Sequence, residues 1–269
     1  MAKSPSFKEF KSKVKGANVI QFTPFLSDTE IDEEGLRKNT RFMIDEGIVE
    51  GKGVLIPNGS NSECFNMSME ERKRVAEIVL EEANGQVPVV TGCNHSSTHL
   101  ALELVQHAED VGMDGVMLTP TYYQTPDDTA IYKHFEHIAS KTDIGIMVYN
   151  NQEVTNRDIP IEVLEDLAQI DNVVALKDCT PVFSKLYRTL HKLGDELAVI
   201  GCRNISHGMC DYSIGCRGHI TRLANYAPQV DLDFYEAAMA GNEERVSELY
   251  DIIMPANMLF GEIGENQAQ

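Results

Sequence analysis

A lysine and a tyrosine, each closing an apolar run, are the residues in this sequence best suited to chemistry. Lys177 ends the run 172–176, and Tyr149 ends the similar run 144–148. Such runs are typical of strands buried on both faces, and active sites form where parallel strands end. A neutral, buried lysine amine can attack a ketone to form a Schiff base, and a nearby phenol can carry the protons. The alternative is that Lys177 is an ordinary solvated lysine.

The loop after another expected strand carries small polar residues. It reads Gly59-Ser60-Asn61-Ser62-Glu63, and backbone N–H groups in such a turn can hold a carboxylate. With a keto carbon on Lys177, these residues describe a site for a 2-keto acid. The loop could also be a simple turn, Tyr122-Tyr123 could be packing aromatics, and Tyr149-Asn150 could be a capping pair.

Neither the histidines nor the cysteines have the spacing of a metal site. His95 and His99 are four apart, as in a helical metal pair, but Ser96-Ser97-Thr98 resembles a helix start and no third ligand is evident. We therefore expect no metal and no organic cofactor. The six scattered cysteines are expected to be reduced thiols, although a reactive thiol at the mouth of the fold stays an alternative. Four of them follow expected strands: Cys64, Cys93, Cys179 and Cys202.

The overall charge excludes several kinds of partner. The chain of 269 residues has a formal net charge of −19, which argues against binding nucleic acid or anionic membranes. No apolar run approaches the ~20 residues of a membrane span, and the first residues do not resemble a signal peptide. We expect a cytoplasmic protein whose partners are small molecules.

The elements that must position these residues alternate along the whole chain. Eight short strands separated by helices predict an α/β fold, a (β/α)8 TIM barrel over residues 1–228. A short C-terminal helical tail over residues 229–269 follows, with helices at 232–240 and 243–253 and a frayed end after Gly261. The expected strands are 18–23, 53–56, 88–91, 115–119, 145–149, 172–177, 197–201 and 218–221. The expected helices between them are 32–46, 69–82, 98–111, 129–140, 161–169, 182–193 and 205–212.

The order of these motifs resembles a known family. From about residue 18 to 228 the chain is similar to the dihydrodipicolinate synthase and N-acetylneuraminate lyase family of class I aldolases. The similar pieces are Thr23-Pro24-Phe25, the loop 59–63, Glu71-Arg72, Thr119-Pro120 with Tyr122-Tyr123, Tyr149-Asn150, 174–178, and 218–221 with Asn225. No single piece is specific, and their joint order carries the resemblance.

The resemblance implies a role for each residue. Lys177 would form the Schiff base, and Tyr149 would act on the bound keto acid and move protons. Tyr123 matches a tyrosine that, in some members, reaches into the site of the partner subunit. Family members are usually homodimers or homotetramers. The residues that would bind substrate are Ser60 and Asn61 at the pyruvate carboxylate, Ile220 in the pyruvate pocket, and Thr23.

Departures from the family pattern bear on the substrate. Members that make dihydrodipicolinate carry an arginine for the second substrate's carboxylate where this chain has Val154, and a proline where it has Gln152. Ser62 replaces the usual glycine. Arg157 and Arg203 lie nearby in sequence and could substitute for the arginine. We therefore expect that the chain is not a true dihydrodipicolinate synthase.

The expected activity is a carbon–carbon lyase reaction. Asn61 resembles the residue of keto-acid aldolases, so the implied reaction cleaves or forms a 4-hydroxy-2-keto or 2-keto-3-deoxy acid, giving pyruvate and an aldehyde. A dehydratase or hydratase-aldolase that uses the same iminium is one alternative. A catalytically silent homologue that binds keto acids is another. The tail is shorter than is usual in the family, so dimer and tetramer both stay open.

Overall fold

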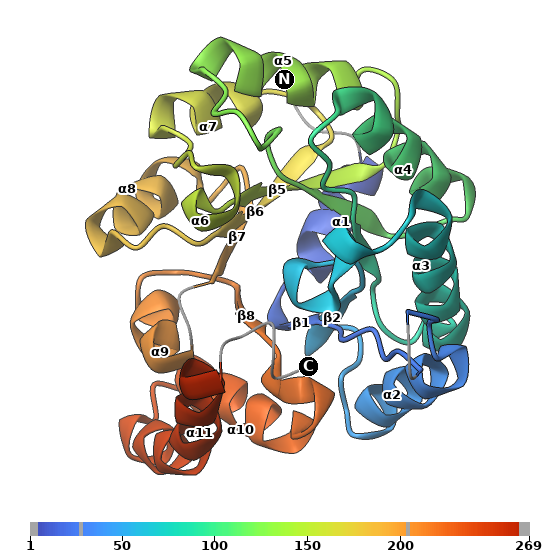
Figure 1. Ribbon diagram of the computed structural model, residues 1–269. Coiled ribbons are helices and arrows are strands. Elements are labelled where there is room, and N and C mark those ends of the chain that lie inside the picture. Colours follow the sequence, from blue (N-terminus) through green and yellow to red (C-terminus); the bar gives the residue numbers. More distant parts are fainter. Residues whose placement is uncertain (1–4, 27–28, 203–204, 264–269) are drawn as a thin grey trace.

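Eight parallel strands form a barrel at the centre of the molecule. The structure is a computed structural model that describes residues 5–26, 29–202 and 205–263 (Figure 1). The sheet order is β2-β1-β8-β7-β6-β5-β4-β3, and a parallel bridge between Leu55 and Val89 joins its two edges. This confirms the expected (β/α)8 barrel. The strands are β1 (Gly16–Ile20), β2 (Gly53–Ile56), β3 (Val90–Gly92), β4 (Gly115–Leu118), β5 (Gly145–Asn150), β6 (Val173–Asp178), β7 (Ala198–Gly201) and β8 (Gly218–Thr221).

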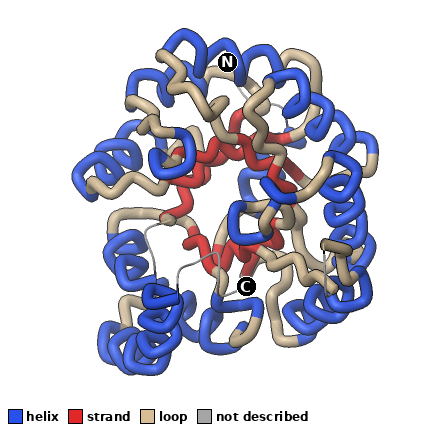
Figure 2. Tube along the Cα trace, viewed as in Figure 1, coloured by secondary structure: helices blue, strands red, loops and turns tan. Residues whose placement is uncertain are grey.

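Helices surround this barrel, as the ring of blue tubes around the red strands in Figure 2 shows. All seven helices expected between the strands are present. They are α2 (Glu33–Asp45), α3 (Met69–Ala83), α4 (Thr98–Asp110), α5 (Asp128–Ala139), α7 (Ile161–Leu167), α8 (Phe183–Leu193) and α9 (Ile205–Ser213). Local capping explains where several begin. Ser68 and Glu71 form a reciprocal capping box at α3, and Asp127 accepts a hydrogen bond from the Ala130 backbone N–H at α5.

The core has two layers because successive strand residues face opposite sides. On β5, Ile146 and Val148 pack outward against the helices, while Met147 and Tyr149 pack inward. The inward side chains of neighbouring strands fill the barrel, so it is a packed core rather than a pore. Tyr149 belongs to the last inward layer before the carboxyl ends of the strands.

An N-terminal helix that the sequence analysis missed fills the end of the barrel where the strands begin. Helix α1 (Pro5–Lys13) lies within the outline of the strand ring in Figure 1. Its Phe7 and Phe10, with Val14 just beyond it, join the inner core cluster. Gly115 and Gly145 open β4 and β5 where any side chain would collide with the Phe10 ring. The spacing of the three apolar residues, at i, i+3 and i+7, is the signal that could have predicted α1.

The C-terminal helices pack together on one side of the barrel. Helix α10 (Pro228–Met239) and helix α11 (Glu243–Ile263) share an apolar cluster with α9, which includes Phe234, Val246 and Leu249. Helix α11 runs ten residues past the expected end at 253, so residues 261–263 are helical rather than frayed, and residues 264–269 lie outside the described chain. The division into barrel and tail at residue 228 stays a prediction. Within the described ranges, no helix is long and apolar enough to cross a membrane.

Candidate active site

Tyr149 and Lys177 lie side by side inside the barrel. They are partners in the register of β5 and β6, so both side chains point to the same face of the sheet. The Lys177 Nζ lies 3.8 Å from the centroid of the Tyr149 ring. Only 2% of Lys177 and 3% of Tyr149 are exposed. The structure therefore brings together the two residues expected to do chemistry.

A β-bulge sets this pairing. Ile146 lies opposite Val173, whereas the next residue, Met147, lies opposite Ala175. Without that extra residue on β6, Tyr149 would lie opposite Leu176, which points away from the barrel interior. Bulges often occur beside active sites, where they redirect a side chain. Here the bulge aligns the phenol with the amine.

The surroundings of Lys177 favour its neutral amine. Burial lowers the pKa of Lys177 from its usual value, because a charged ammonium loses its hydration inside the barrel. Tyr149 and Cys64 act in the opposite direction on this pKa and are weaker than burial. A neutral amine has the free electron pair that attacks a carbonyl carbon.

The next residues on the same two strands form a second pair that faces outward. The Asn150 side-chain N–H donates to the Asp178 carboxylate at 2.8 Å and to Asp158 at 2.9 Å. Lys185 of α8 contacts Asp158 and donates to the Ile159 carbonyl at 2.6 Å. Burial raises the pKa of Asp178. This network fixes the ends of β5 and β6 on the outer side of the barrel. Sequence reasoning gave no role to Asp158 or Lys185.

The loop after β2 is anchored by Ser62, the residue that the resemblance sets against a usual glycine. Ser60–Ser62 form a short 3-10 helix, η1. The Ser62 hydroxyl is buried, donates to the Gln21 carbonyl and accepts from the Gly59 backbone N–H at 3.1 Å. Ser62 thus ties this loop to the segment after β1. Ser60 and Asn61 are half-buried at the end of the barrel where β2 ends.

Two further residues predicted to bind substrate lie at this end of the barrel. Thr23 follows β1, is buried, and its hydroxyl has no hydrogen-bond partner in the part of the chain that the structure describes. Ile220 lies on β8 and packs against the inner core cluster. That the two residues line a substrate pocket with Lys177 stays a prediction.

Tyr123 does not join the buried pair within one chain. Its side chain is 90% exposed, and its φ of +85° is unusual for a residue other than glycine. Arg157 forms an ion pair with Asp128 of α5, so its charge already has a partner. Arg203, the other arginine considered for substrate, lies outside the described residues.

The expectation that all six cysteines are reduced is wrong for two of them. Cys179 and Cys202 form a disulfide with their Cα atoms 4.6 Å apart. The reason is topological: the two residues follow the neighbouring strands β6 and β7, whose ends adjoin. Burial raises the pKa of the Cys64 thiol, and that of Cys93 to about 12. Both thiols therefore stay protonated near neutral pH, which argues against a reactive thiol at either position.

His95 and a cavity at the other end of the barrel lie outside this site. Among the described residues, no group of three or more His, Cys, Asp and Glu side chains could hold a metal ion. His95 precedes α4 and accepts a hydrogen bond from the Ser97 backbone N–H.

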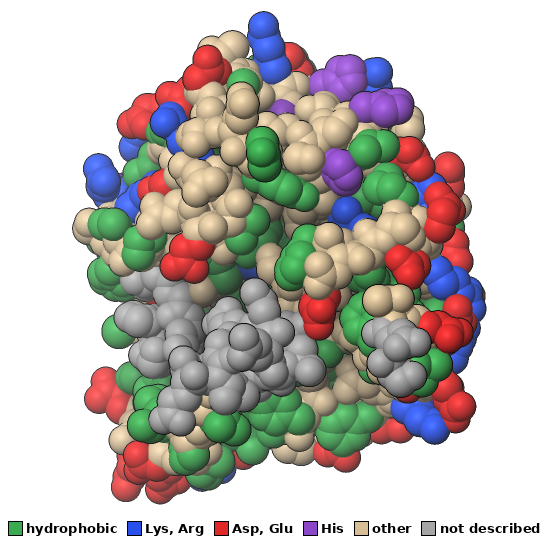
Figure 3. Space-filling model, in the orientation of Figure 1, with side chains coloured by type: hydrophobic (Ala, Val, Ile, Leu, Met, Phe, Trp, Pro, Cys, Tyr) green, Lys and Arg blue, Asp and Glu red, His purple; other side chains and the backbone are tan. Residues whose placement is uncertain are grey.

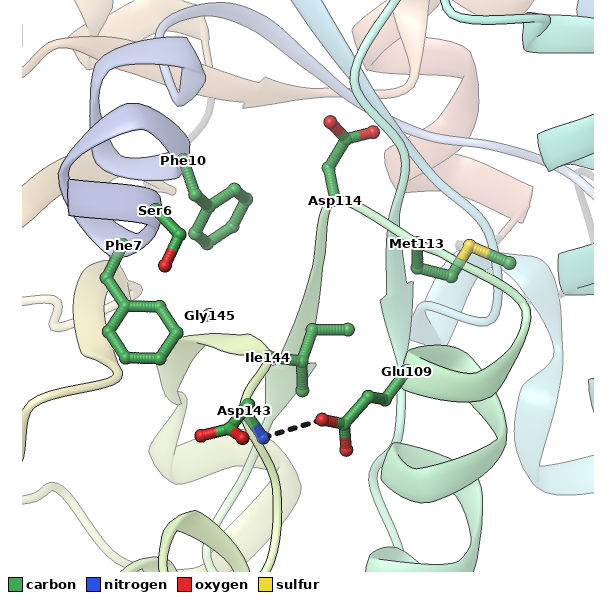
Figure 4. Close-up of a pocket in the computed structure, with 9 residues that line it drawn as sticks. All are labelled: Ser6, Phe7, Phe10, Glu109, Met113, Asp114, Asp143, Ile144 and Gly145. Atoms are coloured by element: carbon green, nitrogen blue, oxygen red, sulfur yellow. Dashed lines mark hydrogen bonds between the residues drawn. The ribbon is translucent and has the colours of Figure 1, made fainter. Parts of the chain in front are cut away.

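A cavity of about 190 Å³ lies beside α1, at the opposite end of the barrel from Lys177 (Figure 4). Phe7 and Gly145 help to line it, so it belongs to the floor of the barrel.

Comparison with known proteins decides the family. A sequence model of the dihydrodipicolinate synthetase family matches residues 13–262. The chain belongs to this family. A 4-hydroxy-tetrahydrodipicolinate synthase of Methanosarcina barkeri is 33% identical over 241 residues, covering 90% of this chain and 81% of the relative. The synthase of Bartonella bacilliformis is 33% identical over 253 residues, covering 91% and 82%.

Solved structures of the family have the same fold. Dihydrodipicolinate synthase from Aquifex aeolicus superposes with a TM-score of 0.85 at 28% identity, covering 91% of this chain and 82% of that one. The chloride-inhibited enzyme from Acinetobacter baumannii, complexed with pyruvate, gives a TM-score of 0.85 at 27% identity, covering 92% and 83%. The family suggested by the sequence motifs is thus confirmed.

Proposed function

We propose that this protein is a class I aldolase that forms a Schiff base between Lys177 and a 2-keto acid. The observation that carries the proposal is the Lys177 amine, which is buried against the Tyr149 ring and whose pKa is lowered by that burial. No cofactor is needed, because the iminium on Lys177 serves as the electron sink. The substrate is a 4-hydroxy-2-keto or 2-keto-3-deoxy acid, and the products are pyruvate and an aldehyde.

The reaction follows from the chemistry of the amine. Lys177 attacks the keto carbon, and the carbinolamine loses water to give an iminium. The C3–C4 bond then breaks: its electrons pass into the iminium to give an enamine, and the C4 hydroxyl loses its proton as the aldehyde leaves. Tyr149 carries the protons. The enamine is protonated at C3, and water releases pyruvate.

The remaining site residues would hold the keto acid in place. Backbone N–H groups and side chains of Ser60 and Asn61 bind its carboxylate, while Ile220 and Thr23 line the pocket. Tyr123, exposed on its own subunit, contributes to the site of a partner in a homodimer or homotetramer. We further propose a cytoplasmic location.

The aldehyde, which is the product of cleavage and the second substrate of the reverse reaction, has no carboxylate near residue 154. Val154 offers no charge there, Glu153 beside it is acidic, and Arg157 is paired with Asp128. A distal carboxylate would therefore gain no ion pair. The synthase reaction is the second candidate, because relatives 33% identical carry that name. Kinetics with matched aldehydes, with and without a carboxylate, separate the two, and a preference for the carboxylate would favour the synthase.

Trapping with borohydride tests the Schiff base directly. Wild-type protein incubated with pyruvate and reduced should gain a pyruvate-derived adduct, found by peptide mass spectrometry on Lys177. Lys177→Ala should lose it, and the surface variant Lys192→Ala should keep it. An adduct on another lysine, or none on folded protein, would refute the proposal.

Analysis of the products separates cleavage from its alternatives. An aldolase releases pyruvate from a 4-hydroxy-2-keto acid, whereas a dehydratase leaves a keto acid lighter by one water. A silent homologue would be stabilised thermally by pyruvate without turning over any of these acids. The aldolase proposal requires pyruvate and aldehyde in equal amounts.

A further inference from the structure

Asn151 contacts the phenol of the candidate site. Its side-chain N–H donates to the Tyr149 hydroxyl oxygen at 2.9 Å. Its side-chain oxygen accepts from the Glu153 backbone N–H at 2.9 Å and so caps α6 (Gln152–Thr155). Its backbone carbonyl accepts from the Thr155 N–H at 3.0 Å. The half-buried side chain is therefore held from both ends.

The cap decides which way the amide points. A backbone N–H can only donate, so the atom facing Glu153 must be the amide oxygen. The NH₂ group then faces Tyr149. An NH₂ group only donates, so Tyr149 accepts through its oxygen and its own proton must point elsewhere.

We propose that Asn151 is a positioning residue that fixes the direction of the Tyr149 proton. With the amide on one side of the oxygen, the phenolic proton turns toward the space above Lys177, where the proposed function places the keto acid. When the phenol gives up this proton, the amide N–H stays on the oxygen and stabilises its negative charge. The inference rests on the proposed function and assigns Asn151 no contact with substrate.

Two substitutions separate this role from helix capping. Asn151→Asp and Asn151→Ser both keep an oxygen that caps α6. The aspartate carboxylate has no proton to donate to Tyr149, and the shorter serine side chain would not reach the phenol while it caps the helix. Loss of one hydrogen bond to a charged group should slow formation of the pyruvate adduct about 10–100-fold, corresponding to roughly 1.5–3 kcal/mol. Gln152→Glu, on an exposed neighbour, controls for the added charge of the aspartate and should leave the rate within about twofold of wild type.

A second background shows whether the effect passes through the phenol. Each Asn151 variant is made again with Tyr149→Phe, and the trapping rates with pyruvate are compared. The effect of Asn151→Asp should fall below about threefold there, because residues that act as a unit are not additive. An equal loss in both backgrounds, or no loss in either, would overturn the inference.

A measurement without turnover separates this inference from the proposed function. Tyrosine labelled with ¹³C at Cζ gives one resonance that disappears in Tyr149→Phe, and Asn151→Asp should shift that resonance. An unmoved resonance overturns the inference. A shifted resonance in a protein that forms no pyruvate adduct supports the Asn151 contact and places the failure in the proposed function.

Discussion

At the scale of single residues, the candidate site sets reactivity against stability. Lys177 is 2% exposed and its pKa is lowered by burial. The fold therefore tolerates an amine that would be more stable in water. Lys185, also buried, differs because it contacts Asp158 and the Ile159 carbonyl. Of these two buried lysines, the one without a carboxylate partner is the better nucleophile.

Replacing Lys177 with methionine should stabilise the protein near neutral pH. The folded pKa lies below the unfolded value, so wild-type stability rises with pH between the two as the unfolded chain binds the extra proton. Lys177→Met removes this slope. Its gain in free energy of unfolding, measured by urea denaturation, should be largest at low pH in that window and shrink toward pH 10. A gain independent of pH would contradict the lowered pKa.

At the scale of elements, sequence patterns predicted the strands and the helices between them, but neither helix α1 nor how the strands align. The apolar runs ending at Tyr149 and Lys177 marked both residues as candidates for the site, because the carboxyl ends of all the strands lie at one end of a barrel. Their direct pairing depends on the bulge after Ile146, which has no signal in either strand alone. The Asn151 contact and the Cys179–Cys202 disulfide likewise need three-dimensional neighbours. Asn151 and Cys179 each lie only two residues after a predicted catalytic residue, Tyr149 and Lys177 respectively.

Helix α1 should contribute strongly to stability. Phe10 is 5% exposed and packs where Gly115 and Gly145 leave room. Phe10→Ala should cost about 3–5 kcal/mol in the free energy of unfolding, as expected for a buried aromatic ring. Phe65→Ala, at an exposed phenylalanine, should change it by less than about 0.5 kcal/mol. Equal values for the two variants would show that α1 does not close the barrel.

The disulfide should hold the ends of β6 and β7 together. It closes a loop with a sequence separation of 23 residues, for which chain entropy predicts a stabilisation of roughly 3 kcal/mol. Reduction by a dithiol should lower the free energy of unfolding by about this amount. The double variant Cys179→Ser/Cys202→Ser should have the lower stability with or without dithiol. If the free energy of unfolding of the wild type were the same with and without dithiol, the result would argue against the disulfide.

At the scale of the whole molecule, the surface charge and the exposed Tyr123 bear on how the proposed site would be completed. Asp and Glu side chains are spread over the visible face, with Lys and Arg between them (Figure 3), and the net charge is −19. The anionic keto acid of the proposed reaction would therefore have to meet local groups that outweigh the field of the whole protein. Tyr123, exposed with a φ of +85°, would be covered if a second subunit packed against it.

Mixing two inactive variants tests whether Tyr123 acts across subunits. Lys177→Ala and Tyr123→Phe should each be nearly inactive alone. In a random mixture of homodimers, half are mixed and each has one complete site, so about a quarter of wild-type activity should return. Activity that never exceeds the sum of the separate variants, with exchange shown by native mass spectrometry, would place Tyr123 outside the partner's site.

The closed floor of the barrel would impose an order on the departure of the products of the proposed reaction. Phe7 and Phe10 of α1 fill the end opposite the strand termini, and Lys177 projects into the interior above them. A keto acid bonded to that amine lies deeper than the fragment just cleaved from it. In the proposed reaction, the aldehyde should therefore leave first and pyruvate second. In steady-state kinetics, pyruvate should compete with the substrate while the aldehyde gives mixed inhibition, and the reverse pattern would contradict a barrel with one open end.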